Sequence, residues 1–127
     1  MYEYLAAGDP SARDPHGVVD GDTLNVTIDL GFHITHHNTL RLYGVNAPEM
    51  RTPEGPPAKQ FVIDWLDKHC PDGTFIIRTI KDKREKYGRY LADVWDMAMV
   101  HSLNVDLVGA GHAVPYYPTP RPTRLAQ

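Results

Sequence analysis

Hydrophobic and polar side chains alternate strictly over residues 24–30. Apolar residues occupy every second position there, at Leu24, Val26, Ile28 and Leu30. Because successive side chains of a strand point to opposite faces, this pattern predicts a half-buried strand. Residues 31–38 are typical of a connection. Leu40 and Leu42 then resume the alternation, with Arg41 on the opposite face.

The pattern then changes to helical spacing. Residues 46–57 are dense in proline and glycine and predict a loop. Over residues 58–69 the hydrophobic positions recur every three to four residues, which predicts a helix with Pro57 in its first turn. Residues 74–80 and 90–95 predict strands joined by a charged turn over 81–89. A short second helix is predicted over 101–110, with Ser102 as its N-cap and Leu103 and Leu107 on its inner face.

Short strands, two helices and 127 residues fit one small domain with a single core. The expected fold class is α+β, mainly β, with helices packed against a β-barrel. The C-terminal part contains Pro115, Pro118, Pro120 and Pro122, so a regular helix is not expected across it. We therefore place a domain at residues 1–117 and a proline-rich tail at 118–127.

Composition narrows the class of protein. Apolar residues make up 42% of the chain and charged residues 23%, as in ordinary globular proteins. No apolar run approaches the roughly 20 residues of a membrane helix, so no membrane partner is expected. No secretory signal is visible, which favours a cytoplasmic location, although a trimmed secreted protein would look the same. The single cysteine, Cys70, excludes an internal disulfide and a cysteine-rich zinc site.

Charge is unevenly distributed along the chain. The net charge is −3, which does not by itself indicate a nucleic-acid-binding protein. However, residues 1–30 carry six acidic side chains against one arginine, and residues 78–90 carry six basic side chains against two acidic ones. One region could therefore bind a metal ion while the other faces phosphate. The alternative is that both runs are solvated surface.

The segment VVDGDT, residues 18–23, places two acids around a glycine just before a strand. This predicts a tight turn that projects carboxylates. Hard cations such as Ca²⁺ and Mg²⁺ prefer these oxygen ligands. An ordinary surface turn is the alternative interpretation.

The segment LRLYGVNAPE, residues 40–49, places Arg41 between two apolar strand residues. Its guanidinium must leave on the opposite face, where it needs an anionic partner or solvent. Glu49 follows Pro48, which restricts the local backbone and so directs the carboxylate. A structural ion pair between Arg41 and Glu49 is the alternative.

The segment DKREKYGRYLADVW, residues 82–95, places Tyr87 and Arg89 at the start of a strand, beside three further basic residues. An aromatic ring among cations suits a nucleotide, because the ring stacks on a base while the cations contact phosphates. A plain charged β-turn is the alternative.

The three segments in this order resemble the staphylococcal nuclease-like (thermonuclease) family. The resemblance runs from about residue 17 to Tyr117, and includes Asn104 and Leu107 in the predicted second helix. It implies a five-stranded barrel of the oligonucleotide-binding (OB) type with two attached helices. The chain stops at Gln127 after the proline-rich tail, so we expect the family's third, C-terminal helix to be absent.

The resemblance also implies a site and an activity. It assigns Arg41 and Arg89 to the scissile phosphate, Glu49 to the attacking water and Asp22 to Ca²⁺ or another divalent cation. The expected activity is hydrolysis of DNA, with RNA as a further candidate substrate, to products with a 3′-phosphate. The remaining assignments are the metal-site positions Asn46 and Ala47 and the substrate-binding positions Lys86, Tyr87, Tyr116 and Tyr117.

Asn46 is the main departure from the family pattern, because it replaces a second metal-binding aspartate. Its amide oxygen can ligate Ca²⁺ but brings no charge, so weaker cation binding is expected. A catalytically impaired nucleic-acid-binding module is the alternative function. Neither the oligomeric state nor the preferred polymer follows from the sequence.

The histidines do not predict a metal site. His33, His36 and His37 lie in the predicted connection with no acid or cysteine beside them. We expect His101 and His112 to be packing or surface residues.

Overall fold

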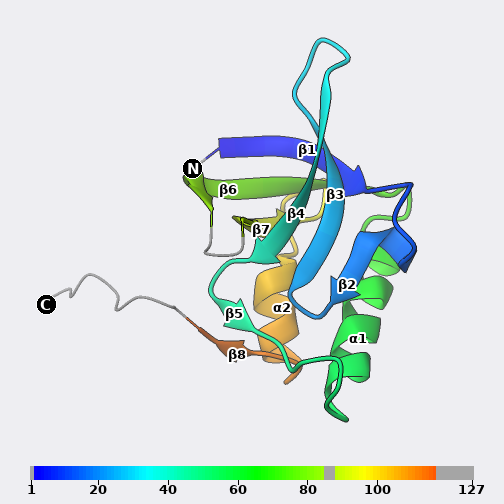
Figure 1. Ribbon diagram of the computed structural model, residues 1–127, viewed down its shortest axis with the longest axis vertical. Coiled ribbons are helices and arrows are strands. Elements are labelled where there is room, and N and C mark those ends of the chain that lie inside the picture. The colour runs from blue at the N-terminus through cyan, green and yellow to red at the C-terminus, as the bar shows by residue number, and fades with distance from the viewer. Residues whose placement is uncertain (1, 85–87, 117–127) are drawn as a thin grey trace, which may run out of the picture.

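Five strands close into a barrel in the computed structural model, which describes residues 2–84 and 88–116 (Figure 1). Each strand pairs with two neighbours, in the order β1–β6–β7–β4–β3 and back to β1. All pairings are antiparallel except that of β4 with β7. The strands of the barrel are β1 (Tyr2–Gly8), β3 (Thr23–Asp29), β4 (Thr35–Leu42), β6 (Thr74–Arg84) and β7 (Tyr90–Trp95). The predicted OB-type barrel is therefore confirmed.

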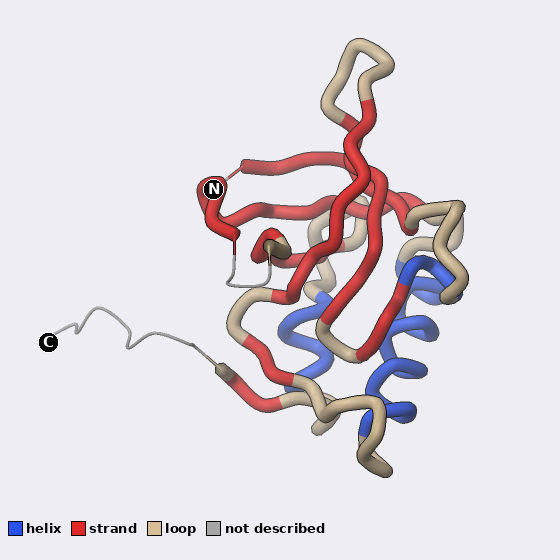
Figure 2. The backbone as a smooth tube through the Cα atoms, viewed as in Figure 1, coloured by secondary structure: helices blue, strands red, loops and turns tan. Residues whose placement is uncertain are grey.

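Short elements flank the barrel. Strand β2 (Val18–Asp20) extends the sheet beside β3 after the 3₁₀ turn η1 (Pro15–Gly17). Strands β5 (Val45–Asn46) and β8 (Val114–Pro115) form a separate antiparallel pair below the barrel (Figure 2). This second pair brings the C-terminal part of the described chain against the segment that follows β4.

The barrel and both helices share one hydrophobic core. Most of the alternating residues predicted to face inward are buried, Leu24, Val26, Leu40 and Leu42 completely, but Leu30 lies just after β3 and is exposed. Helix α1 (Gly55–His69) packs its buried Val62, Trp65 and Leu66 into the same cluster. Removing this apolar surface from water is the main force that holds the helix on the barrel.

Helix α2 (Leu103–Gly109) is joined to the barrel by one buried side chain. Its N-cap is Ser102, as predicted, whose hydroxyl accepts a hydrogen bond from the N–H of Val105 at 3.3 Å. Within the helix, the Asn104 amide donates to the carbonyls of Tyr43 at 3.0 Å and Ala92 at 3.2 Å, and accepts from the N–H of Val94 at 3.1 Å. Asn104 therefore fixes α2 against β7 and the end of β4.

Replacing Asn104 with alanine should destabilise the fold by about 2–4 kcal/mol, because it removes three hydrogen bonds to backbone groups where α2 meets the barrel. Urea denaturation followed by circular dichroism measures this change. Val105→Ala is the matched control, because Val105 lies in the same helix with its side chain largely in solvent. Equal midpoints for the two variants would contradict the proposed role of Asn104.

The β3–β4 hairpin extends well beyond the barrel (Figure 1). Residues 35–38 belong to β4 rather than to a connection, so His36 and His37 lie on a strand and the predicted turn was too long. The tip carries exposed apolar side chains, above all Phe32, which is 94% exposed. Residues 35–38 of β4 pair with β3 but are not buried in the core. The sequence therefore shows no apolar alternation over them.

Two further elements differ from the sequence prediction. Strand β6 continues to Arg84, beyond the predicted end at residue 80. The N-terminal strand β1 was not predicted, although it closes the barrel between β6 and β3. The tail over residues 117–127, where no third helix was expected, lies outside the described residues. In the part of the chain that the structure describes, no helix is both long and apolar enough to span a membrane.

Candidate active site

Asp22 occupies the tight turn between β2 and β3 and is nearly buried, at 7% exposed. Its backbone carbonyl accepts a hydrogen bond from the N–H of Leu42 at 2.9 Å, which joins the turn to β4. Its carboxylate accepts from the Thr23 hydroxyl at 3.0 Å and from the N–H of Ala47 at 2.9 Å. These three bonds hold the carboxylate where β3, β4 and the segment after β5 meet.

Gly21 makes this meeting point sterically possible. A Cβ at residue 21 would lie 2.7 Å from the Cβ of Ala47 and 3.0 Å from that of Ala58. Glycine allows the turn to approach both α1 and the segment after β5 closely. The small side chains at positions 47 and 58 therefore serve the position of Asp22.

Asp20 is a second carboxylate in this turn. Its Oδ1 accepts a hydrogen bond from the N–H of Asp22 at 3.0 Å. Burial raises the pKa of Asp20, and the neighbouring Asp22 carboxylate raises it further despite that hydrogen bond. The sequence assigned only Asp22 to the site, although the DGD spacing also carried the signal for Asp20. A cation beside both carboxylates would relieve the crowding of negative charge.

Arg41 lies beside Asp22 because of the sheet register. Thr23 of β3 pairs directly with Arg41 of β4, which in turn pairs with Leu91 of β7. The guanidinium lies with its Nη1 3.6 Å from Asp22 Oδ2, and the side chain is only 13% exposed. Nη1 also donates to the carbonyls of Leu42 at 3.1 Å and Val45 at 2.9 Å. These contacts fix the planar group in one orientation.

Arg89 approaches the same carboxylate from β7. It lies one residue before that strand begins, and its Nη1 donates to the Thr23 hydroxyl at 3.2 Å. The same hydroxyl donates to Asp22, so Thr23 links Arg89 to Asp22. Arg41 thus lies directly beside the buried Asp22, and Arg89 is joined to Asp22 through Thr23. The structure therefore brings together Asp22, Arg41 and Arg89, which come from separate segments of the chain.

Glu49 lies in the loop before α1 and points into solvent. Its side chain is 65% exposed, and its Oε2 lies 3.0 Å from Nη2 of Arg51. The structural pair of Arg41 with Glu49, considered as an alternative from sequence, does not form. The Glu49 carbonyl accepts hydrogen bonds from the N–H and hydroxyl of Thr52, which close the loop. The backbone of Glu49 is therefore fixed while its carboxylate can change partner.

Asn46 and Ala47 border the site from β5 and the residue after it. The Asn46 Oδ1 accepts a hydrogen bond from Nη2 of Arg41 at 3.2 Å. Both residues line a hollow of about 240 Å³ that continues along Pro48 and the chain from Gly111 to Val114. The amide oxygen of Asn46 is thus oriented by Arg41, and adds a polar, uncharged group beside the Asp22 carboxylate.

Tyr116 stands over Arg41, with the guanidinium carbon 5.9 Å from the centre of the ring. Its N–H donates to the carbonyl of Gly44 at 2.9 Å, next to the β5–β8 pair. An aromatic ring and a cation are therefore placed together, as stacking on a nucleotide requires. The other three predicted substrate-binding residues, Lys86, Tyr87 and Tyr117, lie outside the described residues.

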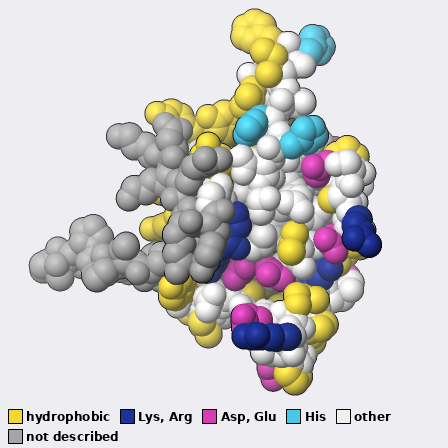
Figure 3. Space-filling model, viewed as in Figure 1, with side chains coloured by type: hydrophobic (Ala, Val, Ile, Leu, Met, Phe, Trp, Pro, Cys, Tyr) yellow, Lys and Arg dark blue, Asp and Glu magenta, His cyan; other side chains and the backbone are white. Residues whose placement is uncertain are grey.

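The described site combines two carboxylates and two guanidinium groups, and a third carboxylate, Glu49, is exposed in the loop before α1. Figure 3 shows acidic and basic side chains side by side on the face below the hairpin. Oxygen donors from Asp20, Asp22 and Asn46 suit a hard divalent cation rather than zinc. Guanidinium groups match the geometry and charge of a phosphate. The arrangement can therefore hold a phosphate ester next to a cation.

Comparisons with known proteins point to one family. The model of the family described as staphylococcal nuclease homologue matches residues 39–126. The chain is 32% identical over 80 residues to a thermonuclease of Staphylococcus hyicus, which covers 61% of this chain and 44% of that protein. It is 28% identical over 107 residues to a thermonuclease of Staphylococcus intermedius, which covers 75% and 61%. The matches thus span about half the length of these relatives. The family match contains Arg41, Glu49 and Arg89, whereas Asp22 lies before it.

Proposed function

Because this chain belongs to the staphylococcal nuclease family, we propose that it is a metal-dependent nuclease that hydrolyses phosphodiester bonds of nucleic acid. The observation that carries the proposal is the convergence of Arg41 and Arg89 on the buried Asp22. Partly buried charges lose hydration, which raises the free energy of the folded protein, and a bound ligand of matching charge offsets that loss. A phosphate and a cation together would match its charges.

The two arginines bind and polarise the phosphate. Hydrolysis passes through a five-coordinate phosphorus whose equatorial oxygens gain negative charge. Guanidinium groups that are already oriented stabilise this charge without reorganising. Arg41 is oriented by the carbonyls of Leu42 and Val45, and Arg89 by the Thr23 hydroxyl. Both can therefore act at the moment the charge develops.

Asp22 and Asp20 would hold the cation, with the backbone carbonyl of Ala47 and the amide oxygen of Asn46 as further donors. When bound, a divalent ion such as Ca²⁺ supplies additional positive charge beside the phosphate. The hydrogen bonds from Ala47 and Thr23 leave lone pairs of Asp22 available to it. Because Asn46 is uncharged, we expect weaker cation binding than an aspartate at position 46 would give.

Glu49 is the proposed general base. It takes a proton from water while the water oxygen bonds to phosphorus, and the bond from phosphorus to the 5′-oxygen breaks. The 5′-oxygen takes up a proton and leaves as a hydroxyl, so the other product ends in a 3′-phosphate. In this scheme Glu49 exchanges its solvent-exposed pairing with Arg51 for a contact with the attacking water when substrate is bound.

The test is digestion of single-stranded DNA, double-stranded DNA and RNA with Ca²⁺, Mg²⁺, Mn²⁺ or a chelator. We expect cleavage with at least one divalent ion and none with chelator. The products should end in a 3′-phosphate that a 3′-phosphatase removes. Saturable binding of DNA without cleavage in any metal would instead identify a binding module. Tyr116 would contribute to substrate affinity in either case.

Asn46→Asp should lower the Ca²⁺ concentration needed for half-maximal cleavage. A charge pair about 4 Å apart is worth about 1 kcal/mol even in water-like surroundings, so the expected decrease is at least about fivefold. The measurement is the cleavage rate as a function of Ca²⁺ concentration. Asn38→Asp, on the β3–β4 hairpin, controls for the change in net charge. An unchanged midpoint would show that Asn46 does not border the cation.

A further inference from the structure

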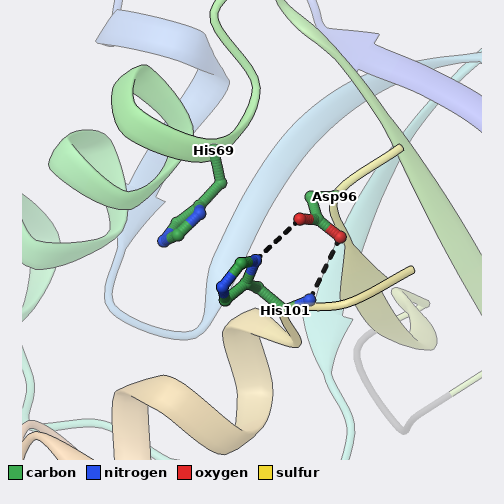
Figure 4. Close-up of side chains that lie close together, drawn as sticks. All are labelled: His69, Asp96 and His101. Carbon is green, nitrogen blue, oxygen red and sulfur yellow. Dashed lines mark hydrogen bonds and ion pairs between the residues drawn. The ribbon is translucent and has the colours of Figure 1, made fainter. Parts of the chain in front are cut away.

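His69, Asp96 and His101 meet where α1 ends, β7 ends and α2 is about to begin (Figure 4). Each offers one ligand atom, and these atoms all lie within 4.8 Å of one another. Among the described residues this is the only group of three histidine, cysteine or acidic side chains placed so closely. Two segments distant in sequence, the end of α1 and the loop between β7 and α2, thus bring two imidazoles and one carboxylate to one point.

Asp96 is held in place by its own loop. Its Oδ1 accepts hydrogen bonds from the N–H of Val100 at 2.8 Å and of His101 at 3.1 Å, and its Oδ2 lies 2.8 Å from Nδ1 of His101. Although burial alone would raise the pKa of Asp96, the bonds and charge from His101 and the bond from Val100 hold it below its ordinary value. Asp96 is therefore a fixed, buried, ionised carboxylate with a histidine as partner.

The contact with Asp96 defines which atom of His101 remains available. Because Nδ1 faces the carboxylate, Nε2 is the free nitrogen, as in the carboxylate–histidine–metal arrangement of many metal sites. The ring of His69 lies 4.2 Å from that of His101, tilted by 32°, and 5.0 Å from that of Trp65. In the described part of the chain, neither ring nitrogen of His69 has a hydrogen-bond partner. Two imidazole nitrogens are thus free on adjacent rings.

We propose that His69 and His101 bind a first-row transition-metal ion such as Zn²⁺, with Asp96 orienting His101 and balancing the charge. Imidazole nitrogen suits Zn²⁺, Ni²⁺ and Cu²⁺, whereas Ca²⁺ and Mg²⁺ prefer oxygen. Nitrogens about 2.1 Å from one tetrahedral ion lie about 3.4 Å apart. The proposed site needs the free nitrogens of His69 and His101 at this spacing, with His101 still held by Asp96 and with water completing the coordination.

This site is separate from the proposed catalytic site. Helix α1 begins at Gly55, whose Cβ position would collide with the Glu49 carbonyl, and ends at His69 after 15 residues. A helix of that length is about 21 Å long from end to end. The metal would therefore join the far end of α1 to the loop between β7 and α2, as a structural clamp. Loss of this metal and loss of nuclease activity can therefore be measured independently.

The test is titration of the intact protein with Zn²⁺ by calorimetry, beside thermal unfolding with and without Zn²⁺. One ion per chain should bind, and the midpoint should rise by about 5–10 °C at a Zn²⁺ concentration 100-fold above Kd. His69→Gln and His101→Gln should each weaken binding at least about 100-fold, and Asp96→Asn about 10–100-fold. His33→Gln, on the exposed hairpin, is the matched control and should bind as wild type does.

A measurement on the unmodified protein guards against a misfolded variant. Substoichiometric Cu²⁺ should broaden the ring proton signals of His69 and His101 in the NMR spectrum before those of any other histidine. Absence of Zn²⁺ binding, unchanged binding in both histidine variants, or broadening confined to His33, His36 and His37 would each overturn the proposal.

Discussion

Replacing Arg41 with alanine is expected to lower the rate of DNA cleavage by about 10²–10³-fold, as removal of one preorganised donor typically does. Nη1 of Arg41 lies 3.6 Å from Oδ2 of Asp22, and the Arg41 side chain is oriented by two backbone carbonyls. Arg41→Lys should recover little of this loss, because an ammonium cannot reproduce two fixed parallel donors. Single-turnover cleavage at saturating Ca²⁺ gives the rate without interference from product release.

The control for Arg41 is Arg78→Ala. Arg78 is also a strand arginine with a carboxylate partner, since its Nε lies 3.0 Å from Oε2 of Glu3. Arg41→Ala also leaves the carbonyls of Leu42 and Val45 without a donor, so its stability should be measured by urea denaturation. If the folded Arg41→Ala variant cleaves as fast as Arg78→Ala, Arg41 does not stabilise the transition state.

Glu49→Gln is expected to lower the cleavage rate by about 10²–10⁴-fold, the usual contribution of a general base. The amide keeps the shape of the side chain but cannot accept a proton from water. Because Glu49 is exposed and its loop is closed by its backbone, the substitution should leave the unfolding midpoint unchanged.

Arg51→Ala tests whether the ion pair of Glu49 with Arg51 contributes to cleavage, apart from the proposed contact of Glu49 with water. An exposed ion pair is worth at most about 1 kcal/mol, so releasing it should change the rate by less than about fivefold. A loss of cleavage rate as large as that of Glu49→Gln would mean that Glu49 and Arg51 act together in catalysis. A Glu49→Gln protein as active as wild type would remove Glu49 from the mechanism.

Much of the barrel follows from local patterns. The alternation over residues 24–30 and at Leu40 and Leu42 predicted β3 and part of β4, because every second residue from Leu24 to Ile28 is completely or nearly buried against one core. Helix α1 was predicted from its spacing and begins two residues earlier than Pro57, at Gly55. Strand β1 was not predicted, because its sequence lacks a clear alternation and it forms by pairing with both β6 and β3.

The site was predicted as a set of residues but not as a geometry. The meeting of Arg41 and Arg89 at Asp22 depends on the register that sets Thr23 opposite Arg41, which no local pattern encodes. For the same reason the sequence did not reveal that Arg41 holds the Asn46 oxygen, or that Glu49 pairs with Arg51. Asp20 could have been included, since it shares the turn with Asp22.

The histidine cluster shows the limit of sequence spacing more clearly. His69 and His101 are 32 positions apart, and His101 was expected to be only a packing or surface residue. They meet because α1 ends beside the loop that precedes α2. The adjacent His36 and His37, which are closer in sequence, lie on the exposed hairpin and do not form such a group with the described residues.

The most direct test of the central claim is the Ca²⁺ dependence of cleavage by the intact protein, measured on one end-labelled DNA strand beside Asp22→Asn. We expect the wild type to cleave with Ca²⁺ and to stop with chelator, and the fragments to carry 3′-phosphates. Asp22→Asn should cleave far more slowly at the same Ca²⁺ concentration. Equal rates for both proteins, or equal rates with Ca²⁺ and with chelator, would rule out a metal-dependent nuclease that uses Asp22.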